Sequence, residues 1–155
     1  MNFPILSAII FIPFIGALFI FATKGEQKNV EKNSQYIAVF SSVTNFFISL
    51  FIWYSFDTST AEFQFIENKN WIDGFVNFQI GIDGISILFI LLTTFITPIC
   101  VFSVINSVKF KIKEFLIAIL IMETLMIGVF CSLDLVIFYL FFEAGLIPMF
   151  LIIGV

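Results

Sequence analysis

The sequence predicts an all-α fold of the polytopic membrane class, and three observations support this prediction. Of its 155 residues, 61% are hydrophobic and 12% are charged, against roughly 45–50% and about 25% in soluble domains. The mean hydropathy is +1.14. The apolar residues form five runs, each close to the roughly 20 residues that a helix needs to cross a bilayer core. We predict membrane-spanning helices over residues 3–22, 36–54, 85–105, 115–131 and 135–155.

The first run, residues 3–22, resembles a signal peptide in length but not in its flanks. A secretory signal begins with a positively charged segment. Here the first positive charges, Lys24 and Lys28, follow the apolar run. We therefore predict that residues 3–22 remain in the protein as a helix.

The lysines predict the orientation of the helices. Short cytoplasmic loops of membrane proteins collect Lys and Arg. Six of these lysines fall between the first and second runs or between the third and fourth: Lys24, Lys28, Lys32, Lys109, Lys111 and Lys113. We predict that both connections face the cytoplasm or matrix and that every lysine of the chain lies in a loop. The N-terminus, residues 55–84 and the tight turn at residues 131–134 then face outward.

The outward connection contains a predicted β-hairpin that leads into the third helix. Residues 62–67, EFQFIE, and residues 76–82, VNFQIGI, alternate polar and apolar side chains, as half-buried strands do. The segment KNWIDG between them is the predicted turn. Asp83 follows the second strand, where its carboxylate can accept hydrogen bonds from the first free amides of the third helix.

Two carboxylates lie inside the apolar runs, Glu123 in the fourth and Glu143 in the fifth. At 1.5 Å per residue, each is about 12 Å from the start of its predicted helix, so in an antiparallel pair both reach a similar depth. A charged side chain near a helix centre costs about 2.5–3.5 kcal/mol on insertion scales, and such residues are typical of proton relays. The alternative is a protonated glutamate that only hydrogen-bonds between helices.

Pro148 predicts a weakened backbone close to Glu143. Proline lacks the amide hydrogen that would bond to the carbonyl of Ala144. In a membrane that carbonyl must be satisfied by a neighbouring helix or by water. An ordinary tolerated kink is the alternative. The polar residues of the second run are predicted to be helix-packing contacts rather than a conduction path: Ser41, Ser42, Thr44, Asn45 and Ser49.

The composition argues against several kinds of site in this chain. There is no His, and the two cysteines, Cys100 and Cys131, lie in separate apolar runs. We therefore expect no haem, zinc or iron–sulfur cluster here. The net charge of −4 is spread over the loops and predicts no nucleic-acid partner. An enzyme with its own membrane active site is also disfavoured, because no nucleophile motif or phosphate loop is present.

Two long segments carry a resemblance to a known family. Residues 80–104, IGIDGISILFILLTTFITPICVFSV, and residues 113–155, which include METLM and FFEAGLIPMF, closely resemble the M subunit of bacterial respiratory complex I, the counterpart of mitochondrial NADH dehydrogenase subunit 4. The resemblance covers nearly the whole chain and is strongest from Gly81 onward. It implies an antiporter-like membrane-arm subunit of NADH:quinone oxidoreductase that translocates protons in a bacterial or mitochondrial inner membrane.

The same resemblance implies the partners and the site residues. Its partners are the lipid bilayer and other membrane-arm subunits, and NADH, FMN, iron–sulfur clusters and quinone are bound by other subunits. Glu143 matches the glutamate of the fifth helix that pairs with a lysine of a later helix. Glu123 matches an acidic residue of the fourth helix, a supporting group in the same half-channel. Both are therefore the predicted catalytic residues of proton translocation.

Two alternative functions remain open from the sequence: a subunit of a multisubunit sodium/proton antiporter, and a non-catalytic membrane scaffold. The last apolar run ends at Val155 without a flanking polar anchor. We therefore expect residues 1–155 to be the N-terminal membrane part of a longer subunit, without a separate soluble domain. The lysine partner of Glu143 would lie beyond Val155.

Overall fold

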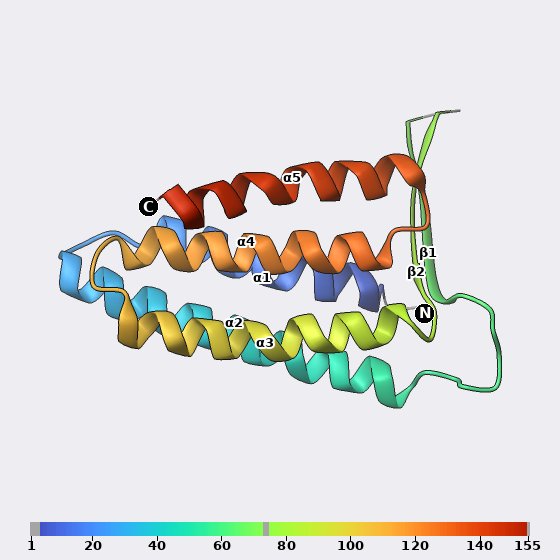
Figure 1. Cartoon of the computed structure of the whole chain (residues 1–155), viewed down its shortest axis with the longest axis horizontal. Helices are drawn as coiled ribbons and strands as arrows, with labels where there is room; N and C mark the ends of the chain where they lie inside the picture. Colours follow the sequence, from blue (N-terminus) through green and yellow to red (C-terminus); the bar gives the residue numbers. More distant parts are fainter. Residues whose placement is uncertain (1–3, 73–74, 155) are drawn as a thin grey trace.

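The computed structural model describes residues 4–72 and 75–154, which form five helices and a two-stranded sheet (Figure 1). The helices are α1 (Ile5–Ala22), α2 (Gln27–Tyr54), α3 (Ser86–Ser107), α4 (Ile112–Cys131) and α5 (Leu135–Gly154). All five are long and apolar enough to cross a membrane. The predicted all-α polytopic fold is confirmed.

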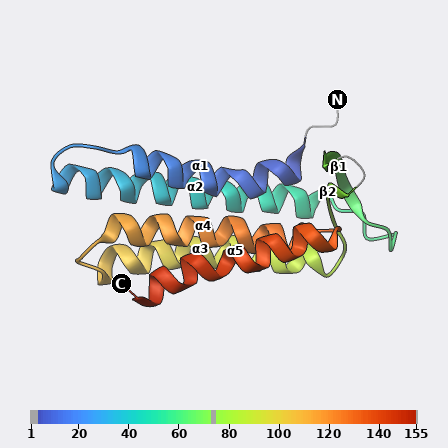
Figure 2. The same cartoon turned by 90° about the horizontal axis from the view of Figure 1, so that it is seen from above.

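The helices pack in two layers, with α4 at the centre. Figure 2 shows α1 and α2 in one layer and α3, α4 and α5 in the other. α4 contacts each of the other four helices. A side chain that points from α4 into the bundle is therefore buried by the neighbouring helices.

The largest difference from the predicted boundaries is at α2, which begins at Gln27 rather than at residue 36. Its additional segment, QKNVEKNSQ, is too polar to register as a membrane span, but Gln, Lys and Glu are good helix formers. Ser34 in this segment is buried, and its hydroxyl donates to the carbonyl of Val30 at 2.7 Å. The helix therefore extends beyond its apolar part.

The expectation that every lysine lies in a loop is wrong. Lys28 and Lys32 lie in α2, Lys69 in the first strand and Lys113 in the first turn of α4. The reason is that helices and strands continue past the apolar segments, as at α2. Lys113 Nζ donates to the carbonyls of Phe21 at 3.2 Å and Thr23 at 2.9 Å, where the C-terminus of α1 favours a cation.

The two lysine-bearing connections lie at the same end of the bundle (Figure 1, left). The sheet and the start of α1 lie at the opposite end, as does the turn between α4 and α5. The predicted arrangement, with both lysine-bearing connections on one side, is therefore present in the fold.

The predicted hairpin is present, but its first strand is longer than expected. β1 (Gln64–Ile72) pairs antiparallel with β2 (Val76–Ile82). Ile72 pairs with Val76, so most of the predicted turn KNWIDG belongs to β1. Asp73 and Gly74 lie outside the described residues. Residues 62 and 63 precede β1.

A β-bulge explains the irregular start of β1. The register shifts between Gln64 and Glu67, and Phe65 adopts a φ of 55°, a left-handed conformation that is unusual for a bulky residue. The bulge lies opposite Gly81. A Cβ added at Gly81 would lie 2.8 Å from Leu133 Cδ1 and 3.3 Å from Ile66 Cγ1. A side chain at this position would therefore displace Leu133 where β1, β2 and the α4–α5 turn meet.

Hydrogen bonds attach the sheet to the bundle at the α4–α5 turn and at the start of α1. The amide of Leu133, in the turn between α4 and α5, donates to the carbonyl of Gln79 at 3.0 Å. Glu67 of β1 accepts hydrogen bonds through Oε1 from the amides of Leu6 at 2.8 Å and Ser7 at 3.2 Å, and through Oε2 from the Ser7 hydroxyl. A carboxylate from the sheet thus caps the first turn of α1, where Pro4 provides no side-chain cap.

Asp83 caps α3 as predicted. Its Oδ1 accepts hydrogen bonds from the amides of Ser86 at 2.7 Å and Ile85 at 3.1 Å. Hydrogen bonds from the backbone and side chain of Ser86, and then from the backbone of Ile85, hold the pKa of Asp83 below its ordinary value of 3.8. The ionised carboxylate is therefore the form that stabilises the start of α3.

This cap predicts an acid-dependent loss of stability. Because the pKa is lower in the folded protein, the stabilisation is complete above pH 3.8 and is lost as the pH falls through the lowered value. Replacing Asp83 with Ala should cost about 1 kcal/mol at neutral pH. Asp83→Asn should retain most of the cap but remove its acid dependence. Thermal unfolding of the full-length protein in detergent, at neutral and acidic pH, would test this; equal unfolding of wild type and Asp83→Ala would contradict it.

Gly128 allows α4 and α5 to approach closely. A Cβ added at Gly128 would lie 2.6–2.8 Å from three ring atoms of Phe141 on α5. Gly128→Ala should therefore displace the ring and destabilise the pair by about 1–3 kcal/mol. Gly145→Ala is the matched control, because a Cβ there meets no described atom within 4 Å. Equal thermal unfolding temperatures for the two variants would show that the α4–α5 contact is not tightly packed.

Candidate functional site

Glu123 is buried in the middle of α4, with 2% of its surface exposed. α4 begins at Ile112, earlier than predicted. Glu123 therefore lies about 16 Å along the helix rather than about 12 Å. Thr124 and Leu120 beside it are also buried, and the Thr124 hydroxyl donates to the Leu120 carbonyl at 3.2 Å.

Asn45 of α2 is the direct partner of Glu123. Asn45 is fully buried, and its Nδ2 donates to Glu123 Oε1 at 2.9 Å. The remaining polar atoms of the pair, Asn45 Oδ1 and Glu123 Oε2, are buried without a hydrogen-bond partner among the described residues. The pair thus joins the two layers of the bundle through one hydrogen bond and leaves two acceptor atoms unused.

The sequence predicts helix packing for Asn45, but not its hydrogen bond with Glu123. The packing role is confirmed for this region, since Asn45 contacts α4 and the hydroxyl of Ser49, one turn further along, lies 2.7 Å from that of Thr94 on α3. Ser34, Ser41, Asn45 and Ser49 are all buried along α2. This helical spacing of polar residues was the available signal that one face of α2 turns inward.

Glu123 also borders a pocket of about 390 Å³ between α3 and α4. The pocket is mostly apolar, and Thr93 and Thr97 of α3 contribute hydroxyl groups to its lining. Those hydroxyls donate to the carbonyls of Phe89 and Thr93 one turn earlier. The side chain of Glu123 therefore lies between a polar partner on α2 and a cavity on the side of α3.

Glu143 has a different environment, because it is exposed on the surface of α5. α5 packs against the bundle through the face that contains Ile137, Phe141 and Pro148. Glu143 lies about 200° around the helix from Phe141 and about 100° from Ala144, at 100° per residue. It therefore points away from α4 and has no hydrogen-bond or ion-pair partner within residues 4–72 and 75–154.

The structure places the two carboxylates at similar depth but does not bring them into contact. Gly128 lies opposite Phe141, and one pocket is lined by both Ile121 and Pro148. In this antiparallel register, Glu143 is level with Met126, within about one helical turn of Glu123. One carboxylate thus faces the interior and the other faces outward.

Pro148 is buried within α5, and the helix continues through it to Gly154. It lines a pocket of about 310 Å³ between α4 and α5, together with Ile147 and Leu151. The predicted weakening of the backbone therefore does not end the helix, and hydration near Ala144 stays a prediction.

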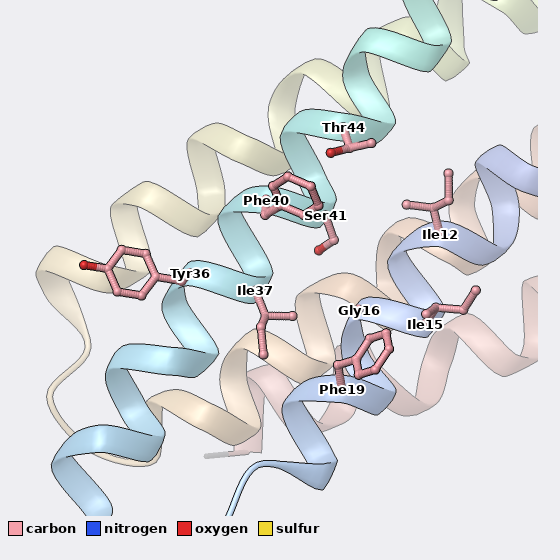
Figure 3. Close-up of a pocket in the computed structure, with 9 residues that line it drawn as sticks. All are labelled: Ile12, Ile15, Gly16, Phe19, Tyr36, Ile37, Phe40, Ser41 and Thr44. Carbon is pink, nitrogen blue, oxygen red and sulfur yellow. The ribbon is translucent and has the colours of Figure 1, made fainter.

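A third recess lies on the other side of the bundle, between α1 and α2. Figure 3 shows its lining of mainly aliphatic and aromatic side chains, with the hydroxyls of Ser41 and Thr44 on α2. The helices are close at Gly16, where an added Cβ would lie 2.7 Å from Ser41 Oγ. The recess has a volume of about 760 Å³ and holds no Asp, Glu or Lys. It is a feature of the apolar outer surface rather than of the carboxylate site.

Five apolar helices around a buried carboxyl–amide pair define a class, the polytopic integral membrane proteins with an intramembrane carboxyl group. Comparison with known proteins identifies relatives of the chain within this class. The chain is 44% identical to NADH-quinone oxidoreductase subunit M of Rickettsia prowazekii over 100% of the chain. It is 48% identical to NADH-ubiquinone oxidoreductase chain 4 of Marchantia polymorpha over 97% of the chain, and 45% identical to subunit M of Rhodobacter capsulatus over the same share. The chain belongs to this subunit M and chain 4 family.

The match covers only part of those relatives. The chain spans 32%, 30% and 29% of the three proteins, respectively. No family model matches the chain. Among solved structures, it resembles a chain in the membrane-bound sulfane sulfur reductase, an archaeal respiratory membrane complex, with a TM-score of 0.74 and 19% identity over 97% of this chain and 22% of that chain. This structural similarity shows a shared fold.

Proposed function

We propose that the chain is the N-terminal membrane part of a longer proton-translocating subunit of NADH:quinone oxidoreductase. The observation that supports this most directly is a buried carboxyl group on the central helix, Glu123, at nearly the same depth as an outward-facing carboxylate, Glu143. Intramembrane carboxyl groups are costly and are typical of ion and proton pathways. The names of the relatives supply the coupled reaction, electron transfer from NADH to a quinone.

In this proposal the two carboxyl groups have different roles. Glu143 exchanges a proton under the influence of a lysine in a later part of the protein, which would face the exposed side of α5. Glu123 is a supporting proton-carrying group inside the bundle. A charge change that arrives from a neighbouring subunit moves the lysine relative to Glu143 and thereby changes its proton occupancy. Because moving one charge against the membrane potential costs about 2.3 kcal/mol per 100 mV, redox energy must drive the cycle.

The proposal includes an orientation and a set of partners. The lysine-bearing connections face the cytoplasm or matrix, and the sheet and the N-terminus face outward, in a bacterial or mitochondrial inner membrane. Other membrane-arm subunits surround the protein. NADH, FMN, iron–sulfur clusters and quinone are bound by other subunits. The orientation is supported by the position of Lys113, which lies at the same end of the bundle as the α1–α2 connection.

The function is tested by proton pumping in vesicles that contain the complete complex with Glu143→Gln. Substantial loss of pumping would support the proposal. Unchanged pumping would support the alternative of a non-catalytic scaffold.

A labelling experiment tests the orientation separately. We expect a single cysteine introduced at Glu62, which is exposed and lies just before β1, to react with a membrane-impermeant reagent added from the outer side. A cysteine introduced at Lys109 should be protected from it. For both variants, the native cysteines of the full-length subunit, Cys100 and Cys131 among them, are first replaced by Ala. The reverse labelling pattern would contradict the orientation.

A further inference from the structure

The buried pair of Asn45 and Glu123 contains two hydrogen-bond acceptors and lacks a donor for them. An ionised carboxylate only accepts hydrogen bonds, and so does the carbonyl oxygen of an amide. The one contact between the residues, from Nδ2 to Oε1, leaves Oδ1 and Oε2 unused in a region without exposure to solvent. A buried acceptor without a donor costs about 1–3 kcal/mol, and more when it belongs to a charged group.

The surrounding polar groups do not supply that donor. The hydroxyl of Thr124 donates to the Leu120 carbonyl, and those of Ser49 and Thr94 are engaged with each other and with carbonyls of their own helices. No ion pair reaches Glu123 within residues 4–72 and 75–154. The amino group of Lys113, on the same helix, is bonded at the end of α1.

A proton on Oε2 of Glu123 turns that oxygen from an unpaired acceptor into a donor. A protonated carboxyl group has one O–H donor and keeps acceptor capacity at its other oxygen. It would then accept from Nδ2 at Oε1 and present its hydroxyl at Oε2, while no net charge remains buried between the layers. Because the amide of Asn45 is attached to Oε1, it also decides which oxygen carries the proton.

We propose that Glu123 is a neutral carboxylic acid because it is buried without a counter-charge, and that Asn45 is its positioning residue, which holds the carbonyl oxygen on the amide and leaves the proton on Oε2. This inference rests on the proposed function, because it makes Asn45 the group that orients the supporting carboxyl of the relay. Asn45 does not exchange protons itself. It acts through Glu123 by orienting the carboxyl group between α2 and the pocket that contains Thr93 and Thr97.

Infrared difference spectroscopy of the assembled complex tests the protonation state directly. The wild-type protein should show a carboxylic acid C=O band at neutral pH that disappears in Glu123→Gln. In Asn45→Leu the band should move to higher frequency, because its oxygen loses a hydrogen bond from the amide. Failure to find any band that depends on Glu123 would overturn the proposal. This comparison needs only the wild type and Glu123→Gln, and no variant of Asn45.

Proton pumping by the same variants tests the positioning role. Asn45→Leu should lower pumping about tenfold, on the scale of one buried hydrogen bond, and Asn45→Gln should restore part of it. Ser49→Ala is the matched control, because it also removes a buried polar contact of α2, that with Thr94, but leaves Glu123 untouched. If Asn45→Leu does not assemble, Asn45→Ser is measured instead. Unchanged pumping and an unmoved band in these Asn45 variants would overturn the proposal.

The experiments distinguish failure of the positioning role of Asn45 from failure of the proposed function. Pumping that survives Glu143→Gln would reject the function while the infrared band still reports on Glu123. Conversely, pumping that is lost in Glu143→Gln but unaffected by Asn45 variants would retain the function and reject the positioning role.

Discussion

Replacing Glu143 with Gln in the full-length protein should reduce proton pumping and NADH:quinone activity by at least about 100-fold, because glutamine has the same shape but cannot exchange a proton. General acid–base groups typically contribute 10²–10⁴-fold. Glu143 is exposed on α5 and has no hydrogen-bond or ion-pair partner in the described part of the chain. The substitution therefore removes no contact seen here, and the helix should form as before. The measurement is pumping and quinone reduction in membrane vesicles, normalised to the amount of assembled complex.

Two control variants sharpen this experiment. Glu143→Asp keeps an ionisable carboxyl group and should retain part of the activity. Glu114→Gln removes an exposed carboxylate from the first turn of α4 and should leave pumping unchanged. Glu143→Gln that pumps as well as Glu114→Gln would show that Glu143 does not exchange the pumped proton.

Replacing Glu67 with Ala should destabilise the outer end of the bundle by about 2 kcal/mol. The carboxylate accepts two amides and one hydroxyl at the start of α1, from a position 61 residues away from Leu6. Loss of a helix N-cap alone costs about 0.5–2 kcal/mol, and donors left partly buried add to this. The negative charge also interacts favourably with the N-terminal end of the helix dipole.

Thermal unfolding of the purified full-length protein in detergent measures this effect. Glu67→Gln retains one side-chain acceptor and should fall between wild type and Glu67→Ala. Glu62→Ala is the control, because Glu62 is exposed and lies just before β1. If Glu67→Ala unfolds at the same temperature as Glu62→Ala, the cap does not stabilise the link between the sheet and α1.

The number, order and approximate length of the helices followed from the sequence because a bilayer imposes a length on each apolar run. The start of α5 at Leu135 and the cap at Asp83 depend on local patterns, a tight turn and a short carboxylate side chain, and these were predicted. The start of α2 was not, because hydropathy measures preference for the membrane and not the tendency of a polar segment to continue a helix.

Composition and the five apolar runs were sufficient to predict a polytopic helical membrane protein and to single out Glu123 and Glu143, because an apolar run makes every charge within it conspicuous. The packing of the helices was needed to show that Glu123 faces inward to Asn45, that Glu143 faces away from the bundle, and that Glu67 caps α1. These relations depend on the rotation of each helix about its axis and on contacts between distant segments. A periodic apolar sequence leaves both open, because nearly every face of such a helix is compatible with lipid.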